Sequence, residues 1–255
     1  MEEAIAYNSW IHNYRIEVFA SQPNHHPARC DEYCGQPGWT CVKILRSIVD
    51  RAVSGYIHTL NYSISDKEYF PELHDISQEY GLKTGKNASF AVFLKAVRAR
   101  RADWKRSLGD DHFLPQADMQ CDNSSVLHIP LEALEEGFRL VNQTAGIYFN
   151  STGFTSWHYV RKSEPPTTQT LIANIPHLPF SELYHSNRRL KFPYDAFFVD
   201  PVANSAFCEL YCMDIQLYAD MCQQPLLANN ENIQEACHKE RSRILDICGP
   251  VYDYF

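Results

Sequence analysis

The sequence predicts an α/β fold of three layers with a mainly parallel sheet, formed by a single domain over residues 1–255. Strand-like and helix-like segments alternate along the chain, which is typical of this class. The first unit is a strand, a long loop and a helix, the usual opening of an α/β half. Apolar residues make up 45% of the chain, which is enough for a sizeable core.

The first unit begins with a strand over residues 14–20, YRIEVFA, in which polar and apolar residues alternate. The loop over residues 21–38 contains three prolines and two glycines. A helix over residues 40 to about 60 comes next. Its apolar side carries Val42, Leu45, Val49, Val53 and Ile57. Because ligands collect at the carboxyl ends of parallel strands, the loop is a candidate site.

The middle of the chain continues the alternation. The letters SDKE form a capping box at the start of a helix over residues 65–80, and Gly81 ends that helix. A basic helix follows over residues 88–108. A strand over residues 125–130, SVLHIP, and a helix over residues 131–141 complete this part.

The C-terminal half begins with short strands and ends with two helices. The strands are expected over residues 146–150, 157–162, 170–175 and 192–200. Because no helix separates the first three, we expect an antiparallel edge there. Helices follow over residues 206–222 and 230–248. The last helix has a core side formed by Ile233, Ala236, Cys237, Ile244 and Ile247.

The basic helix lies in a segment, residues 83–106, that holds eight Lys or Arg and one acid, although the formal net charge of the chain is −8. Phe93, Val97, Trp104 and Leu108 share one side of the helix. Five cations share the other side: Lys95, Arg98, Arg101, Lys105 and Arg106. A helix docked by its apolar side would offer these cations to a polyanion, with RNA the first candidate. A solvated surface helix explains the same pattern.

Several classes of protein are disfavoured by the sequence. The glycine-rich dinucleotide and phosphate loops are absent, so no cofactor is expected. No apolar run approaches 18 residues, so no membrane partner is expected. The acidic N-terminus lacks the apolar core of a secretory signal, which favours a cytoplasmic location.

The nine cysteines leave two interpretations open. An odd number without a signal peptide favours reduced thiols. The high Cys content and five Asn-x-Ser/Thr sequons instead favour a secreted, disulfide-bonded glycoprotein. The sequons are at Asn61, Asn87, Asn123, Asn142 and Asn150.

Two groups of residues resemble metal ligands, but neither predicts a metal. The first group is His25, His26, Cys30, Cys34 and Cys41. Its Cys-x3-Cys and x6-Cys spacings are wider than those of structural zinc sites. The second is Asp110 with Asp111, and adjacent carboxylates on a helix diverge. We leave metal unassigned.

The candidate catalytic residues are Ser21, at the end of the first predicted strand, and Glu182, Tyr184 and Tyr194 near the last predicted strand. A serine at a strand end is a recurrent nucleophile position in open α/β sheets. A Glu and a Tyr near one site can relay protons. An ordinary polar loop and a charged surface connection explain the same residues.

The order of these features resembles the tRNA-dependent cyclodipeptide synthases, and its general character is similar to the fungal, arginine-using branch. The stretch VFASQPNHH matches the bacterial Gly-Ile-Ser…Asn-Ser-Tyr-Phe pattern at Ser21 only, and the bacterial Tyr-x-x-x-Glu-x-Pro pattern is missing. The resemblance implies a Rossmann-like fold, similar to the catalytic domain of class I aminoacyl-tRNA synthetases.

The resemblance also implies acyl transfer between two aminoacyl-tRNAs, giving a cyclic dipeptide that contains Arg. Ser21 would accept the first aminoacyl group, Glu182 or Tyr184 would move protons, and the basic helix would bind tRNA. The ester is already activated, so no cofactor is needed. The alternatives are a secreted disulfide-bonded glycoprotein, such as an effector, and a non-catalytic RNA-binding module. A metal-dependent hydrolase using Asp110 and Asp111 is more distant.

Overall fold

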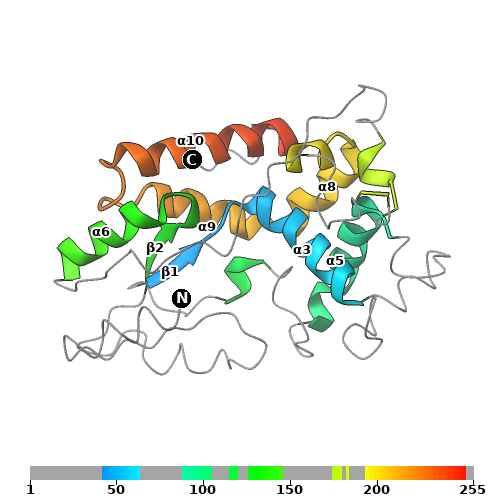
Figure 1. Ribbon diagram of the computed structural model, residues 1–255, viewed down its shortest axis with the longest axis horizontal. Helices are drawn as coiled ribbons and strands as arrows, with labels where there is room; N and C mark the ends of the chain where they lie inside the picture. Colours follow the sequence, from blue (N-terminus) through cyan, green and yellow to red (C-terminus); the bar gives the residue numbers. More distant parts are fainter. Residues whose placement is uncertain are drawn as a thin grey trace.

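A computed structural model describes residues 42–63, 88–104, 115–119, 126–145, 174–179, 182–183 and 193–250 (Figure 1). Its strands are β1 (Val42–Leu45) and β2 (Leu127–Pro130). Its α-helices are α3 (Ile48–Ser63), α5 (Phe90–Trp104), α6 (Leu134–Ala145), α8 (Pro201–Leu210), α9 (Cys212–Cys222) and α10 (Glu231–Cys248). Short 3-10 helices are η2 (Gln116–Met119), η3 (Leu131–Ala133), η5 (Ile175–His177) and η7 (Tyr194–Phe197).

The two strands pair in parallel, with Val42 opposite Leu127 and Leu45 opposite Pro130. One face of the pair packs on Phe138 of α6. Helix α6 approaches closely because Gly137 has no side chain: a Cβ there would lie 2.8 Å from Cβ of Ile129. In the described part of the chain β1 and β2 are the only strands, so the three-layer, Rossmann-like fold stays a prediction.

An aromatic core joins α3, α5 and α8. Tyr56 of α3 meets Phe90 and Phe93 of α5 at ring distances of 5.4 and 5.3 Å. Phe90 in turn contacts Phe197 and Phe198 edge to face, at 5.4 and 5.3 Å. All five rings are buried, and such pairs add to the free energy gained by burial alone. Phe198 also meets Phe207 of α8 at a ring distance of 4.8 Å, so this core fixes the apolar side of α5 against α8.

The C-terminal helices begin at well-formed caps. The side chain of Asp200 accepts from the N–H of Ala203 at the start of α8, where Pro201 is the first residue. Asn230 caps α10 through the N–H of Ile233, 3.1 Å away. These local patterns explain why α8 and α10 start where they do. Figure 1 shows α10 lying alongside α9.

Three element predictions are wrong. The helix expected from residue 40 is strand β1 followed by α3, because VKIL pairs with LHIP and α3 starts only at Ile48. The strand expected over residues 192–200 contains the 3-10 helix η7, and the consecutive residues Ala196, Phe197 and Phe198 are buried, whereas a half-buried strand would alternate buried and exposed residues. The helix expected over residues 206–222 is two helices separated at Tyr211.

Other predictions are confirmed. The strand SVLHIP contains β2, the helix after it is η3 with α6, and the predicted core residues Ile233, Cys237 and Ile244 of α10 are buried. The strand over residues 14–20, its loop and the helix over residues 65–80 lie outside the described residues, as do the strands over residues 146–162. Ile175, which ends another predicted strand, begins η5. No helix in the described ranges is long and apolar enough to span a membrane.

Candidate functional site

The predicted catalytic residues fall partly outside the described part of the chain. Ser21 and Tyr184 lie outside it. Glu182 is exposed in a turn, where its N–H donates to the carbonyl of Pro179 at 2.9 Å. Tyr194 is half-buried and begins η7. The structure thus places Glu182 and Tyr194 in two separate turns and does not test their catalytic roles.

The basic helix is confirmed as an amphipathic helix for those side chains that the structure describes. Phe93 and Val97 are buried, and Lys95 and Arg98 are exposed. Arg98 forms an ion pair with Glu209 of α8, so part of the basic side is neutralised. The side chain of Arg101, together with Lys105 and Arg106, lies outside the description.

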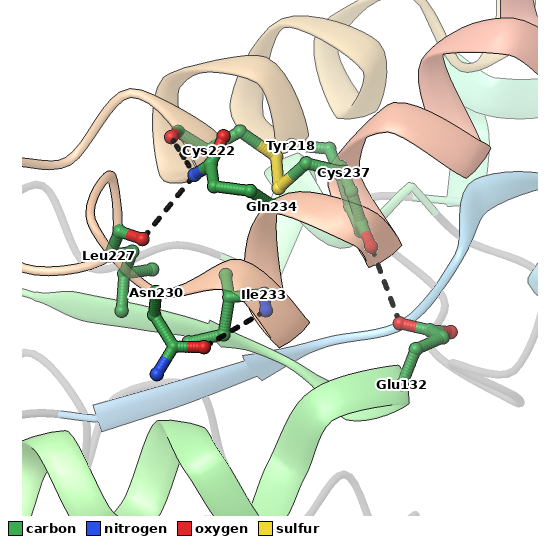
Figure 2. The surroundings of a disulfide bond; sticks show 8 residues. All are labelled: Glu132, Tyr218, Cys222, Leu227, Asn230, Ile233, Gln234 and Cys237. Atoms are coloured by element: carbon green, nitrogen blue, oxygen red, sulfur yellow. Dashed lines mark hydrogen bonds between the residues drawn. A yellow bond between two sulfur atoms is a disulfide. The ribbon is translucent and has the colours of Figure 1, made fainter.

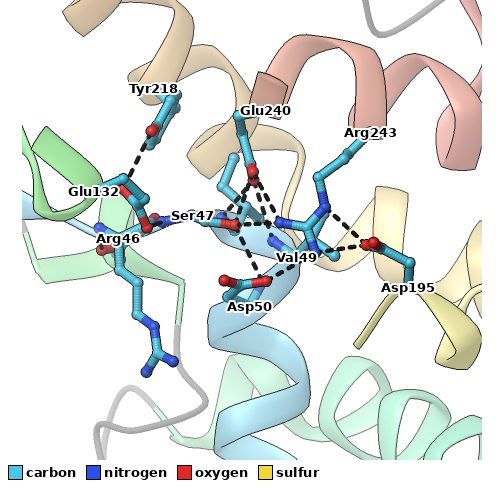
Figure 3. Close-up of polar contacts among 11 residues, drawn as sticks. Arg46, Ser47, Val49, Asp50, Glu132, Asp195, Tyr218, Glu240 and Arg243 are labelled. Atoms are coloured by element: carbon cyan, nitrogen blue, oxygen red, sulfur yellow. Dashed lines mark hydrogen bonds and ion pairs between the residues drawn. The ribbon is translucent and has the colours of Figure 1, made fainter. Parts of the chain in front are cut away.

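A polar cluster at the start of α3 links this helix to α10. We call Ser47, Asp50, Glu240 and Arg243 the cap cluster (Figure 3). Glu240 of α10, which is 2% exposed, accepts from the hydroxyl of Ser47 and from the N–H of Ile48, both at 2.7 Å. A second N–H, that of Val49, lies 3.2 Å away. Glu240 therefore caps a helix that begins 192 residues earlier.

Arg243, one turn further along α10, balances this buried carboxylate. Its guanidinium lies 2.7 Å from Asp50 and 2.6 Å from Asp195, and donates to Ser47 Oγ at 3.1 Å (Figure 3). Burial lowers the pKa of Arg243, but Asp50 and Glu240 outweigh burial and hold the pKa above its usual range. The cluster thus keeps a permanent positive charge beside Glu240.

The chemistry of the cap cluster is that of a structural cap. A serine hydroxyl bonded to a carboxylate resembles a nucleophile with its base. Ser47, however, is 1% exposed, and its oxygen also accepts from the N–H of Asp50 at 3.2 Å and from Arg243. Burial raises the pKa of Glu240, while Arg243 and Ser47 oppose the rise. Since Ser47 is enclosed and its lone pairs are used, we do not assign it as a nucleophile.

Glu132 connects the cap cluster to α9. One carboxylate oxygen accepts from the N–H of Ser47 at 2.7 Å, and the other from the hydroxyl of Tyr218 at 3.3 Å. Arg46, the residue before Ser47, turns its guanidinium away from the cluster and donates to Ser54 Oγ at 3.1 Å (Figure 3). The carboxyl end of β1 is therefore occupied by contacts within the protein.

A second polar cluster lies on the face of the strand pair opposite α6. Lys43 of β1 lies beside His128 of β2 and donates to the carbonyl of Gln116 at 2.6 Å. Asp214 of α9 caps η2, accepting from the N–H of Gln116 at 2.8 Å and of Ala117 at 2.7 Å. We call Lys43, Gln116, His128 and Asp214 the sheet-face cluster.

Both bases of the sheet-face cluster have shifted pKa values. Burial lowers the pKa of Lys43 to about 8, although Asp214 opposes the shift. Burial and the nearby Lys43 lower the pKa of His128 to about 4, so this imidazole is neutral at pH 7. Nε2 of Gln224 lies 3.3 Å from Nδ1 of His128.

Metal binding finds no support within the described residues, where no three His, Cys, Asp or Glu side chains are grouped to hold an ion. His25, His26, Cys30, Cys34 and Cys41 lie outside these ranges, as do Asp110 and Asp111.

The C-terminal cysteines form two disulfides, Cys208–Cys248 and Cys222–Cys237. The prediction of reduced thiols is wrong for these four residues, whereas Cys212 is free and half-exposed. Figure 2 shows Cys222–Cys237 joining α9 to α10. Beside it the amide of Gln234 donates to the carbonyls of Cys222, at 3.0 Å, and Leu227, at 3.3 Å. Covalent and polar contacts thus fix the connection between the two helices.

Comparison with known proteins returns nothing: no family model, no curated protein and no solved structure matches this chain.

Within the described residues the buried carboxylates are Asp214 and Glu240, and both escape sequence analysis because the N–H groups that they accept from lie about 100 to 200 residues away in the sequence. One signal points to Glu240. It follows Ile233 by seven residues and precedes Ile244 by four, so it lies on the apolar side of α10. A carboxylate on an apolar side must find donors when the helix docks. The pattern indicates burial but does not identify the donors.

Proposed function

We propose that this chain is a disulfide-bonded protein of an oxidising compartment that acts by binding a partner. The observation that carries the proposal is the pair of disulfides Cys208–Cys248 and Cys222–Cys237. Disulfides persist in secreted and extracellular proteins and are rare where thiol reductants are abundant.

The cap cluster serves the fold rather than catalysis. Ser47, Glu240 and Arg243 are buried or largely enclosed, and their polar atoms bond one another and the start of α3. A catalytic group needs contact with a substrate, and these groups are engaged within the protein. In the proposed role they stabilise the helices whose outer faces meet the partner.

Thiol counting tests the proposal. The chain has nine cysteines, four of which are in disulfides, so denatured protein without reductant should give no more than five free thiols. The control is the same protein after reduction, which should give nine. Nine thiols in both samples, from protein made in a secreting eukaryotic cell, would contradict the proposal.

Glycan analysis is a second test of the same proposal. Asn142, the sequon residue on α6, and four further sequons meet the acceptor pattern. Protein secreted from a eukaryotic cell should lose mass on treatment with an amidase that removes N-linked glycans. An Asn142→Gln variant shows whether this helix carries one of them.

A second candidate is the aminoacyl-tRNA-dependent transferase that forms a cyclic dipeptide, acting in the cytoplasm. The observation that favours it is helix α5, which docks by its apolar side and leaves Lys95 and Arg98 exposed. The test is the small-molecule profile of a bacterium that expresses the chain, measured by mass spectrometry against an empty vector. A new mass equal to two ring-joined amino-acid residues, one of them Arg, would support the transferase, and Ser21→Ala should then abolish the product. Abundant soluble protein without a product supports the binding role.

A further inference from the structure

Helix α10 is held in place by little apolar burial. Of its eighteen residues the buried ones are Ile233, Cys237, Glu240 and Ile244. Only two of these are large aliphatic residues, and a third, Ile247, packs against the core while half-buried. Cys237 belongs to a disulfide, and the burial of the Glu240 carboxylate costs free energy that only its hydrogen bonds within the cap cluster offset. The docking of α10 therefore depends on disulfides and on the cap cluster more than on hydrophobic contact.

The two disulfides hold α10 at different places and differ in exposure. Cys222–Cys237 ties the second turn of α10 to the end of α9, and Cys208–Cys248 ties its last residue to α8. Cys222, Cys237 and Cys208 are buried, whereas Cys248 is half-buried. A thiol in solution therefore has its best access at Cys248. The α10 residues of the cap cluster lie between the two attachment points.

We propose that α10 is a thiol-sensitive latch: reduction of Cys208–Cys248 releases its carboxyl-terminal half and with it the cap on α3. The reductant is a small dithiol, or two equivalents of a monothiol. The inference rests on the proposed function, because the latch is closed only where the disulfides form. Its consequence is a change in the binding surface when the protein passes from an oxidising to a reducing compartment.

The reduction is balanced in two steps. A thiolate attacks Sγ of Cys248, forms a mixed disulfide there and expels the thiolate of Cys208, which takes up a proton. A second thiolate attacks the sulfur of the bound reductant, so that Cys248 leaves as a thiolate and is protonated. Two electrons pass from two reductant thiols to the protein disulfide, and the oxidised reductant leaves as a disulfide.

Release of this half of α10 removes Glu240 from the start of α3. The N–H groups of Ile48 and Val49 then lose the carboxylate that accepts from them. Helix α5 does not depend on this contact, because the apolar side of α5 is fixed by the aromatic core around Phe90. The latch therefore predicts a local response at residues 48–50 and in α10, with α5 unchanged.

The experiment is graded reduction of the oxidised full chain with dithiothreitol, followed by alkylation, cysteine mapping and amide hydrogen exchange. Cys208 and Cys248 should become alkylated at a lower reductant concentration than Cys222 and Cys237. At that step the amides of residues 48–50 should exchange about 30-fold faster or more, which is the lower end of the change expected in an opening equilibrium on the loss of a typical disulfide. Exchange in α5 should stay constant.

The paired variants are matched controls. Cys222→Ser with Cys237→Ser should keep the response of residues 48–50 to reductant, while Cys208→Ser with Cys248→Ser should show fast exchange without reductant. If the latter variant fails to fold, graded reduction of the native chain still decides the question. The latch is overturned if reduction of Cys208–Cys248 leaves amide exchange at residues 48–50 unchanged. It is also overturned if reduction accelerates amide exchange in α5 by the same factor.

The thiol count separates the two proposals. Nine free thiols in untreated protein overturn both the latch and the proposed function. Five or fewer, with no response at residues 48–50, overturn the latch alone.

Discussion

Helices α5 and α10 both pack against α8, but by opposite means. Helix α5 buries Phe90, Phe93 and Leu94 in an aromatic core, with Lys95 left in water. Helix α10 buries the carboxylate of Glu240 and is tied by two disulfides. The contrast shows that one protein can fix neighbouring helices either by hydrophobic burial or by covalent and polar contacts, and the two should respond differently to mutation and to solvent.

Truncation of Phe90 gives the largest expected effect on the α5 side. Phe90→Ala should lower the free energy of unfolding by about 4 kcal/mol, because a fully buried ring is replaced by a cavity in the core. Urea unfolding followed by circular dichroism measures the loss. The exposed neighbour Lys95→Ala serves as control and should change stability little. A similar small loss for both variants would show that α5 is not fixed by its rings.

Removal of the buried carboxylate is the matching change on the α10 side. Glu240→Ala should lower the free energy of unfolding by about 3 kcal/mol, because it leaves the start of α3 uncapped and removes a buried partner of Arg243. The control Glu235→Ala removes an exposed carboxylate from the same helix. The same urea titration compares them. Equal losses would mean that the cap cluster contributes nothing beyond surface charge.

The contrast between the helices also explains what the sequence could predict. The apolar side of α5, with Phe93 and Val97, could be predicted from residue spacing alone. Burial of apolar side chains does not require a specific partner, so the sequence of the neighbouring helix need not be known. The apolar side of α10 could likewise be predicted. The role of Glu240 could not, because its donors at Ile48 and Val49 are 192 and 191 residues away.

The errors in the fold prediction have the same origin. Val42 and Leu45 fit the apolar side of a helix that continues through Val49, and only pairing with Leu127 makes this stretch a strand. The pairing of the cysteines could not be predicted because connectivity is a property of the folded chain. Cys208 and Cys212 are four residues apart, yet one is bonded to Cys248 and the other is free. Predictions for Ser21, and for the proton relay of Glu182 and Tyr184, stay predictions.

The sheet-face cluster gives a smaller, pH-dependent effect. The pKa of His128 is about 4 when folded, below its ordinary value of 6.5, so the unfolded chain binds more protons between these values. Its contribution to stability is therefore present above pH 6.5 and is lost as the pH falls towards 4. For this half-buried group we expect a loss of about 2 kcal/mol.

The measurement is the free energy of unfolding between pH 4 and pH 7 for the native chain and for His128→Gln. The variant should show a flatter dependence on pH, since it has no imidazole to protonate on unfolding. His238→Gln, which removes an exposed histidine from α10, should leave the slope as it is. A slope that His128→Gln leaves unchanged would sink this explanation.

The ion pair between Arg98 and Glu209 gives the smallest effect, and it bears on function more than on stability. The two side chains are 51% and 40% exposed, so Arg98→Ala should lower the free energy of unfolding by about 0.5 kcal/mol or less, and a double-mutant cycle with Glu209→Ala should give a coupling of the same size.

The effect of the same residues on RNA binding should be larger if α5 binds RNA. If α5 is a nucleic-acid surface, Arg98→Glu should weaken binding and reduce its dependence on salt, while Glu209→Ala, which frees Arg98 from its partner, should strengthen binding. If neither variant changes RNA binding, the cations of α5 are ordinary solvated surface residues, and any partner of this protein binds to a different surface.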